Sequence, residues 1–403
     1  KEKAAICLDN RYEDTYIMTI DIDKFKALNN IYGYEFCNTV LKDFGEKLSK
    51  VLPYNNVISR IAGDVFATIF SSDKDIIILL NKIVDELSVL KINDIDIHIK
   101  LSMGVCKVNF DDNDINKLLD KSYMSRSKVK GLYNQNYYIF DSVLENQLVE
   151  EQKIESTMEE ALKNKEFKVV YQPKTYTKTE KLSGAEALVR WERDGEIIPP
   201  SKFIALFEKN KFIVKLDLYI FEQACSDIAS WIEKFNFQPI VSINVSKEHF
   251  INENFIEEYV EIANKYNVDR SKIDLEITES AIIDRNVDTI KILNNIKEKG
   301  FTISIDDFGT GYSSLSMLQS TPIDVIKIDK VFVDKADLDS EKNIINYIMY
   351  LAERLEVRTI VEGVETKEQV EFIRKLNCDV IQGYYYSKPL NKEDFEEYME
   401  KNR

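Results

Sequence analysis

A repeated pattern in the second half of the chain constrains the fold more than any other feature of the sequence. Short runs rich in β-branched residues alternate there with amphipathic helical segments, which is typical of a parallel α/β fold. Eight such runs in about 250 residues match the size of a (β/α)8 TIM-like barrel. We expect its strands at residues 168–173, 185–191, 240–245, 273–277, 302–306, 325–328, 359–361 and 380–381.

Polar side chains, most of them acidic, stand at or near the C-terminal ends of these runs. Such ends converge on one face of a barrel, where many carboxylates repel each other unless cations lie between them. Their oxygen atoms suit Mg²⁺ or Mn²⁺, and two divalent cations are expected. The alternative, that each acid only begins a surface loop, is weakened by the repetition. The side chains are Glu186, Asn244, Glu276, Glu279, Asp306, Asp307, Lys327, Asp329, Glu362, Glu365 and Gln382.

Residues 1–145 show a different order of elements. Their strands and helices follow the sequence βαββαβ, which resembles the palm of nucleotide cyclases and polymerases and indicates an α+β domain. A polar stretch at 146–164, without Pro or Gly, predicts a connecting helix before the barrel of 165–403. The expected elements of the first domain are a strand at 16–23, helices at 24–30, 40–52 and 74–90, a hairpin at 57–70 and a strand at 97–108.

Composition excludes several classes of function. A net charge of −16 argues against nucleic-acid binding, which needs clustered basic side chains. With His98 and His249 as the only histidines, zinc or Ser-His-Asp chemistry is disfavoured, and both are expected to be structural. Five cysteines without a CxxC spacing predict core residues in a reducing cytoplasm, and no run is long enough to span a bilayer. Because the chain starts at Lys1, we expect a piece of a longer protein, with room for an upstream sensor or membrane anchor.

Motifs of the second half resemble those of the EAL-type cyclic di-GMP phosphodiesterases. The motifs that carry the resemblance are Tyr171-Gln172-Pro173, Glu186-Ala187-Leu188-Val189-Arg190-Trp191, Asn244-Val245-Ser246, Glu276-Ile277-Thr278-Glu279, Asp306 to Leu315, Ile326-Lys327-Ile328-Asp329, Glu362-Gly363-Val364-Glu365 and Gln382-Gly383-Tyr384. The resemblance implies metal-dependent hydrolysis of cyclic di-GMP, a bacterial second messenger, to linear pGpG. It also implies a homodimer through this domain, with the loop at 307–315 beside the contact.

The same resemblance implies roles for individual residues. Lys327 would orient water or neutralise charge, and Glu279 would brace the loop at 309–314. The implied metal ligands are Glu186, Asn244, Glu276, Asp306, Asp307 and Glu362, and the implied catalytic residues are Glu186, Glu279, Asp307, Lys327 and Glu362. The implied substrate-binding or supporting residues are Gln172, Leu188, Arg190, Glu365 and Gln382.

The first half resembles the GGDEF diguanylate cyclases, but with departures. Its signature loop stands as Ala62-Gly63-Asp64-Val65-Phe66, so that Val65 replaces a metal-binding glutamate, and Asn38 replaces a guanine-contacting aspartate. A valine cannot hold a metal, so a degenerate, N-terminally truncated domain without cyclase activity is expected. Asp21, Asn29 and Asp64 remain and imply a regulatory GTP site, with an empty scaffold as the alternative.

Two hypotheses from different classes follow. The first is a phosphodiesterase regulated by its first domain. The second is a non-catalytic receptor that binds cyclic di-GMP and passes the signal to a partner. The complete set of acids favours the enzyme, because a receptor has no need of every metal ligand.

Overall fold

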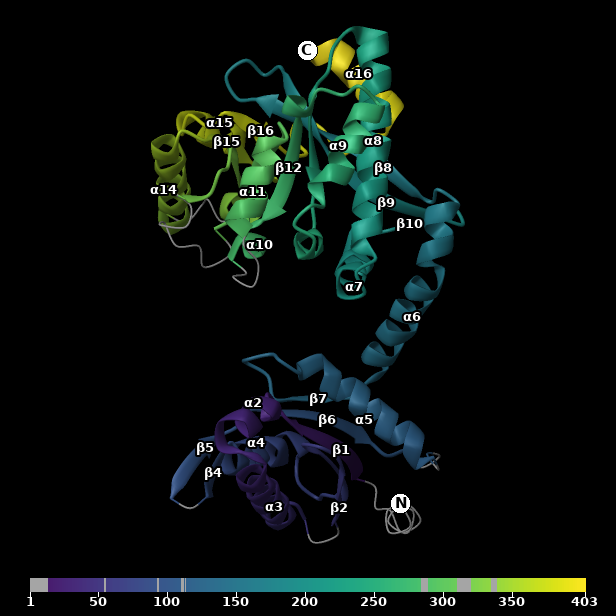
Figure 1. Cartoon of the computed structure of the whole chain (residues 1–403), viewed down its shortest axis with the longest axis vertical. Helices are drawn as coiled ribbons and strands as arrows, with labels where there is room; N and C mark the ends of the chain where they lie inside the picture. Colours follow the sequence, from purple (N-terminus) through teal and green to yellow (C-terminus); the bar gives the residue numbers. More distant parts are fainter. Residues whose placement is uncertain are drawn as a thin grey trace. The chain divides into compact units, whose positions relative to one another are not determined.

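The chain folds into two compact units, which cover residues 1–150 and 151–403. The structure is a computed structural model that describes residues 14–53, 56–92, 94–109, 112, 114–283, 289–309, 320–334 and 339–403 (Figure 1). Helix α6 (Ser142–Lys163) begins in the first unit and ends in the second.

The first unit is built on a five-stranded sheet with the strand order β2-β3-β1-β6-β7. The central strand β1 is antiparallel to β3 and β6, whereas β6 and β7 are parallel. The strands are β1 (Thr15–Ile22), β2 (Asn56–Ala62), β3 (Val65–Ser71), β6 (Leu101–Lys107) and β7 (Tyr137–Ile139). This arrangement confirms the palm-like domain that the sequence predicted.

Helices cover both faces of this sheet. Alternate side chains of β1 divide between two cores: Met18 packs with Phe44 of α3 and Ile83 of α4, whereas Ile17 packs with Leu118 of α5. This is the period of two that a strand buried on both faces requires. The helices are α2 (Phe25–Tyr32), α3 (Tyr34–Val51), α4 (Ile76–Leu87) and α5 (Ile115–Val129).

The predicted strand at 97–108 is wrong in one respect. It divides into β5 (Ile95–His98), which pairs only with β4 (Val89–Ile92) in a separate hairpin, and β6 of the main sheet. The break falls at Ile99 and Lys100, and because Ile97, Ile99 and Leu101 are all buried, the alternation of buried residues continues through it and gives no sign of it. Helix α5 and strand β7 were also not predicted.

The second unit is a closed barrel whose strands follow the order β9-β11-β12-β13-β14-β15-β16-β8, with β8 returning to β9. All eight predicted strands are present, and the barrel fold is confirmed. The strands are β8 (Phe167–Tyr176), β9 (Leu182–Arg193), β11 (Ile240–Asn244), β12 (Ile273–Thr278), β13 (Thr302–Phe308), β14 (Val325–Ile328), β15 (Arg358–Val361) and β16 (Val380–Gln382). A short strand, β10 (Glu196–Ile198), extends β9 as a hairpin.

The barrel is not wholly parallel, which corrects the simple (β/α)8 expectation. Strand β8 runs antiparallel to both β9 and β16. The other neighbouring strands of the barrel, from the pair β9–β11 round to the pair β15–β16, are parallel to each other. The hairpin from β8 to β9 needs only a short connection, whereas two parallel strands need a crossover. As a result, the inward side chains Gln172 and Lys174 enter the interior from a strand of opposite direction.

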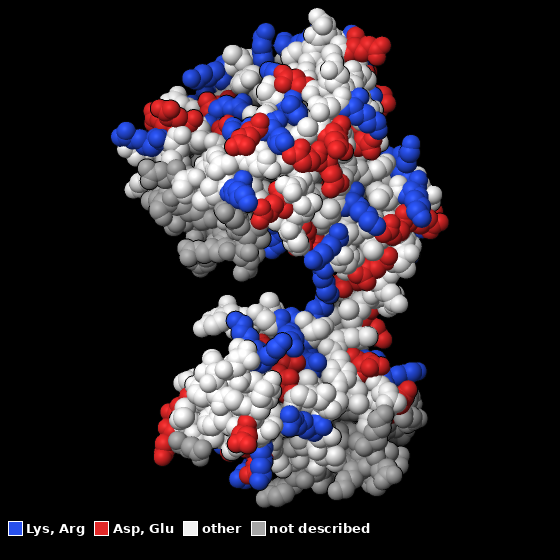
Figure 2. Space-filling view, in the orientation of Figure 1, with Lys and Arg blue, Asp and Glu red and all other residues white. Residues whose placement is uncertain are grey.

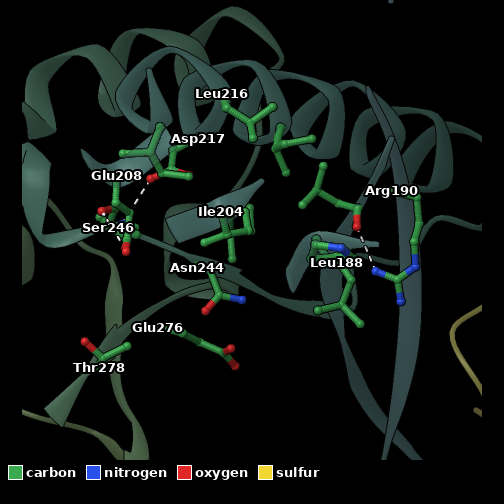
Figure 3. A pocket seen from close by; sticks show the side chains of 17 residues that line it. Leu188, Arg190, Ile204, Glu208, Leu216, Asp217, Asn244, Ser246, Glu276 and Thr278 are labelled. Atoms are coloured by element: carbon green, nitrogen blue, oxygen red, sulfur yellow. Dashed lines mark hydrogen bonds between the residues drawn. The ribbon is translucent and has the colours of Figure 1, made fainter. Parts of the chain in front are cut away.

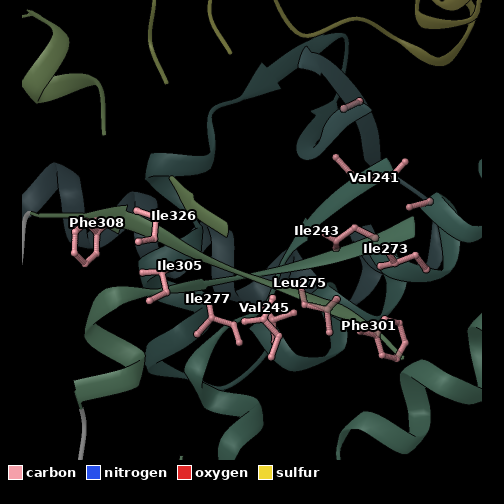
Figure 4. Packing of buried hydrophobic residues seen from close by; sticks show 14 of the residues in the cluster. Val241, Ile243, Val245, Ile273, Leu275, Ile277, Phe301, Ile305, Phe308 and Ile326 are labelled. Atoms are coloured by element: carbon pink, nitrogen blue, oxygen red, sulfur yellow. The ribbon is translucent and has the colours of Figure 1, made fainter. Parts of the chain in front are cut away.

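Helices surround the barrel (Figure 1). Apolar side chains fill the layer between the helices and the barrel. Ile243, Leu275 and Ile305 are fully or almost fully buried in this core (Figure 4). The helices are α7 (Ile204–Lys209), α8 (Ile213–Phe235), α9 (Ile256–Lys265), α10 (Glu279–Ile283), α11 (Thr289–Glu298), α13 (Lys330–Asp334), α14 (Asp339–Leu355), α15 (Lys367–Lys375) and α16 (Lys392–Asn402). Short 3-10 helices occur at Pro200–Lys202, Lys247–Ile251 and Arg270–Lys272.

Two global properties of the sequence are visible in the structure. In the described ranges, none of the helices is long and apolar enough to cross a membrane. Acidic and basic side chains are interspersed over the face of the second unit drawn in Figure 2.

Four cysteines, Cys37, Cys106, Cys225 and Cys378, are buried free thiols, which confirms them as core residues. Cys7 lies outside the described residues.

Gly104 on β6 allows helix α5 to pack directly on the sheet. A Cβ atom at this position would lie 1.9 Å from the carbonyl oxygen of Ser122 and 2.3 Å from the amide nitrogen of Arg126. We therefore expect Gly104→Ala to lower the stability of the first unit by about 1–3 kcal/mol, because backbone atoms must move to accept the methyl group. Urea unfolding followed by circular dichroism measures this, with Gly45→Ala on α3 as the control expected to change stability little.

Candidate functional site

The centre of the site is the buried ammonium group of Lys327. Its Nζ lies 2.6 Å from Glu276 Oε2, 2.9 Å from Asp306 Oδ1 and 2.8 Å from Glu362 Oε1, and 3.7 Å from Glu186 Oε2. Lys327 is 1% exposed and lies on β14, between the strands that carry the acids. Four of the predicted ring members therefore meet at one lysine that was also predicted.

Two amide side chains fix the remaining carboxylate, Glu186. Asn244 Nδ2 donates to its Oε1 at 3.0 Å, and Gln382 Nε2 donates to its Oε2 at 2.6 Å. Gln382 also donates to Gln172 Oε1 at 3.3 Å. These contacts join β8, β9, β11 and β16 at the level of the ring, so the ring closes around the barrel.

A residue that the sequence analysis missed lies one layer deeper. Lys174 Nζ donates to Glu276 Oε1 at 2.7 Å and to Ser242 Oγ at 2.5 Å, and Lys174 is 3% exposed. The reversed direction of β8 places Lys174 two residues below Gln172 on the inward face. An isolated lysine in a strand reads as a surface residue, although its position two residues after Gln172 was the available signal.

The electrostatics of the ring show an excess of negative charge. Burial alone would raise the pKa of Glu276, but Lys174 and Lys327 outweigh it and lower the pKa to about 2. Burial raises the pKa of Glu362 to about 8 despite Lys327, because Glu186 and Asp306 oppose its ionisation. Burial and Glu276 likewise raise the pKa of Glu186.

Lys327 responds in the opposite direction to its neighbours. Burial would lower its pKa, but the surrounding acids, Glu186 first, raise it well above the ordinary value. Lys327 is therefore a permanent cation. The two lysines do not neutralise all of the carboxylates, which is why Glu362 resists ionisation.

Asp307 and Glu279 lie at the edge of the ring and shape the loop that follows β13. Asp307 takes a left-handed conformation, with φ 53°, and burial, Asp306 and a hydrogen bond with Asp329 raise its pKa to about 6. Glu279 Oε2 accepts a hydrogen bond from the backbone N–H of Gly309 at 2.9 Å. The structure does not describe residues 310–319, so most of the predicted loops at 307–315 and 309–314 lies outside the described residues.

Glu365 is the predicted residue that the described contacts do not bring to the ring. Its Oε1 lies 2.5 Å from Lys330 Nζ, and both side chains are nearly half exposed. Gly363, at φ 66°, turns the chain after Glu362 and directs the two acids of this motif differently. Glu365 lies four residues after the end of β15, where the alternation that orients strand side chains no longer applies.

A pocket of about 290 Å³ opens beside the ring, between the C-terminal ends of β9, β11 and β12 and helices α7 and α8. Its lining is mostly apolar, and Asn244 and Glu276 lie on one side of it while Leu188 and Arg190 lie across from them (Figure 3). Asp217 of α8 accepts a hydrogen bond from the backbone N–H of Ser246 at 3.0 Å and so holds the turn after Asn244. His249, expected to be structural, binds the same Asp217 carboxylate at 3.1 Å.

The donor set fits hard divalent cations. It offers five carboxylates and one amide on the barrel strands or directly after them, and oxygen donors of this kind are those that Mg²⁺ and Mn²⁺ prefer. Within the described ranges, no three of the acids, thiols or imidazoles already have the spacing of an ion's ligands. The physical reason is that three of the carboxylates point at the Lys327 ammonium group.

The first unit contains a smaller acidic site. Asp21 is 3% exposed, and its Oδ2 lies 2.8 Å from Lys130 Nζ and 3.9 Å from Arg126 Nη2. Asp64 lies near both basic groups, and burial, followed by the repulsion from Asp21, raises its pKa. Val65 pairs with Asp21 across the sheet. Asn29 lies on α2, and no described contact joins it to this site.

Two parts of the chain match known protein families. Residues 155–389, more than half of the chain, match the family model described as "EAL domain". The chain belongs to the EAL domain family. Residues 2–131 match the model described as "Diguanylate cyclase, GGDEF domain", so a GGDEF domain precedes the EAL domain.

Several relatives match nearly the whole of this chain. The chain is 31% identical to the signaling protein YkoW of Bacillus subtilis over 393 residues, which cover 96% of this chain and 49% of that protein. It is 28% identical over 388 residues to the cyclic di-GMP phosphodiesterase NbdA of Pseudomonas aeruginosa, which cover 95% of this chain and 50% of NbdA. The chain therefore spans about half the length of these relatives.

A solved structure shares the fold of the EAL domain. The structure titled "PaMucR Phosphodiesterase, c-di-GMP complex" is 31% identical, with a TM-score of 0.58, and the match covers 60% of this chain and 99% of that chain. The likeness extends over the whole of that EAL structure.

The raised pKa of Glu362 predicts how the metal-free protein responds to pH. An acid whose pKa rises from 4.5 to about 8 on folding stabilises the fold less as pH rises through that interval. We expect stability in EDTA to fall between pH 5 and pH 9 by up to a few kcal/mol, since one pKa unit corresponds to about 1.4 kcal/mol.

Glu362→Gln should remove most of this loss, because the amide is neutral at every pH. Urea unfolding at several pH values measures it, with the exposed Glu371→Gln of α15 as the control. An unchanged pH dependence in Glu362→Gln would show that Glu362 is ionised without a metal.

Proposed function

We propose that the chain hydrolyses cyclic di-GMP to linear pGpG with two divalent cations, Mg²⁺ or Mn²⁺. The observation that carries this proposal is the ring of four acids, Glu186, Glu276, Asp306 and Glu362, around Lys327 inside the barrel, beside an open pocket. The printed names of NbdA and of the MucR complex, a phosphodiesterase and a cyclic di-GMP complex, support the same substrate.

The residues divide between holding cations and holding substrate. Glu186, Asn244, Glu276 and Asp306 would hold one cation, and Asp306, Asp307 and Glu362 the second. When bound, such cations neutralise charge on the attacked phosphate and lower the pKa of water. Glu279 fixes the start of the loop after β13 through Gly309.

Lys327 contributes a fixed positive charge to the reaction. It is a buried, permanent cation among the acids, so it stabilises negative charge that develops on a phosphate oxygen without needing to reorganise. Gln382 holds Glu186 from the opposite side of the ring, and Gln172 accepts a hydrogen bond from Gln382. The ring is thus organised before any substrate arrives.

The pocket supplies the surface for the rest of the substrate. Arg190 and Leu188 lie across it from Asn244, and a guanidinium group suits a phosphate while an apolar wall suits a base. Glu365 is assigned a supporting role outside the ring, because it pairs with Lys330. The pocket and the ring share Asn244 and Glu276, so a ligand in the pocket reaches the acids.

A cyclic di-GMP hydrolysis assay with Mg²⁺ or Mn²⁺ tests the proposal. We expect linear pGpG from the wild type, and a loss of more than about 100-fold in Glu186→Ala or Asp306→Ala, since even residues behind metal ligands cost 10–100-fold. Glu298→Ala, an exposed acid on α11, serves as the control with unchanged turnover. Binding of cyclic di-GMP without any turnover would instead favour the receptor hypothesis.

For the first domain we propose regulation by GTP without cyclase activity. Val65 stands beside Asp21 where a metal-binding acid is needed for synthesis, and Lys130 already pairs with Asp21. The hydrolysis assay with and without GTP tests this: faster turnover with GTP supports regulation, and unchanged turnover supports an empty scaffold. Formation of cyclic di-GMP from GTP would overturn the loss of cyclase activity.

We also propose that the EAL domain forms a homodimer. Helix α14 exposes Ile344, Tyr347 and Tyr350 three residues apart, a spacing that places them on one face. Light scattering should give twice the chain mass, and Tyr347→Glu should shift it toward the monomer because a charge would be buried in the contact. The control is Glu353→Gln on the same helix, and a monomeric wild type would contradict the proposal.

A further inference from the structure

Lys174 is a buried lysine that the proposed mechanism does not use. Its side chain is 4% exposed, and it lies beneath the ring rather than in it. Its Nζ donates to Glu276 Oε1 at 2.7 Å and to Ser242 Oγ at 2.5 Å. Burying a lysine costs free energy unless its partners are well placed, so this arrangement calls for a specific role.

Glu276 is held at both ends by two different ammonium groups. Lys174 contacts Oε1 and Lys327 contacts Oε2, the latter at 2.6 Å. Of the two carboxylate oxygens of Glu276, Oε2 contacts the Lys327 ammonium group, which Asp306 and Glu362 also contact. The orientation of the carboxylate is therefore set from beneath by Lys174.

A polar layer inside the barrel anchors Lys174 in turn. Ser242 Oγ accepts from Lys174 and donates to Asp274 Oδ2 at 2.8 Å. Asp274 Oδ2 also accepts from Ser304 Oγ at 2.5 Å. This layer connects β8, β11, β12 and β13 through buried hydrogen bonds, which gives the ammonium group a fixed position.

We propose that Lys174 is a positioning residue for Glu276: it binds Oε1 from beneath and keeps Oε2 directed at the ring of acids where the divalent cations are held. The inference rests on the proposed function, because it takes Glu276 as a metal ligand. Residues behind a metal ligand orient it, and their loss weakens metal binding.

Lys174 can act on metal binding through its positive charge or by positioning Glu276, and these two effects predict opposite changes in metal affinity when Lys174 is replaced. The positive charge of Lys174 repels a nearby cation, so removing only that charge would tighten metal binding. Removing the hydrogen bond leaves Glu276 Oε1 without its donor, and the carboxylate is then free to turn away from the ring. Weaker metal binding is therefore the signature of positioning.

The experiment is calorimetric titration of the full chain with Mn²⁺, for the wild type and for Lys174→Met, which preserves length without charge. We expect Lys174→Met to weaken Mn²⁺ binding about 10-fold. Hydrolysis should fall at low Mn²⁺ concentration and recover at high concentration. The control is Lys265→Met, which removes an exposed lysine 2.6 Å from Glu222 and should leave Mn²⁺ binding unchanged.

Two further variants separate positioning from general damage to the fold. Ser242→Ala retains the charge but removes the 2.5 Å contact, and it should also weaken Mn²⁺ binding. In a Glu276→Gln background, Lys174→Met should change Mn²⁺ affinity by less than about twofold, because two residues that act through one contact are not additive. Circular dichroism confirms folding in each case.

The outcomes distinguish a failure of the positioning role of Lys174 from a failure of the proposed function. Equal or tighter Mn²⁺ binding in Lys174→Met overturns the positioning role while leaving the proposed function intact. If that variant does not fold, unchanged Mn²⁺ binding in Ser242→Ala overturns the role. A wild type that neither binds Mn²⁺ nor hydrolyses cyclic di-GMP overturns the proposed function, and this inference with it.

Discussion

The contact between one buried ammonium group and a ring of carboxylates organises the second unit. Lys327 lies within 3 Å of three acids that come from different strands or strand ends, and the side chains of all three are mostly buried. Such a cluster is unfavourable unless positive charge is supplied, because desolvation penalises every charge. The raised pKa of Glu362 shows that internal lysines do not fully meet this need. The same imbalance that costs stability makes the ring suited to cations.

The reversed strand β8 extends this organisation below the ring. A parallel strand would bring its last inward residue to the ring, whereas β8 brings Gln172 to it and continues downward to Lys174. Glu276 is consequently held by one lysine in the ring and by another beneath it. The position of each carboxylate thus depends on several strands, and the ring is rigid before ligands bind.

The two units solve a similar electrostatic problem with different means. In the first unit, Asp21 is paired directly with Lys130, and a valine occupies the neighbouring position across the sheet. Two basic side chains, Lys130 and Arg126, therefore match the two acids of this site, Asp21 and Asp64. In the second unit the acids outnumber the lysines. This difference is why we assign metal-dependent chemistry to the barrel and regulation to the first unit.

The sequence by itself determined the two folds and most of the ring, because the ends of alternating, β-branched runs predict where side chains such as Glu276 and Asp306 converge. It also indicated Lys327, which follows the same rule. Only the tertiary structure decided the direction of β8, the break between β5 and β6, the place of Glu365 and the contact of Lys174 with Glu276. Hydrophobic alternation records which face of a strand is buried but not which way the strand runs. The direction of β8 is set by its hairpin with β9 and by its pairing with β16, about 200 residues further along the chain, and the second pairing exists only in the folded barrel.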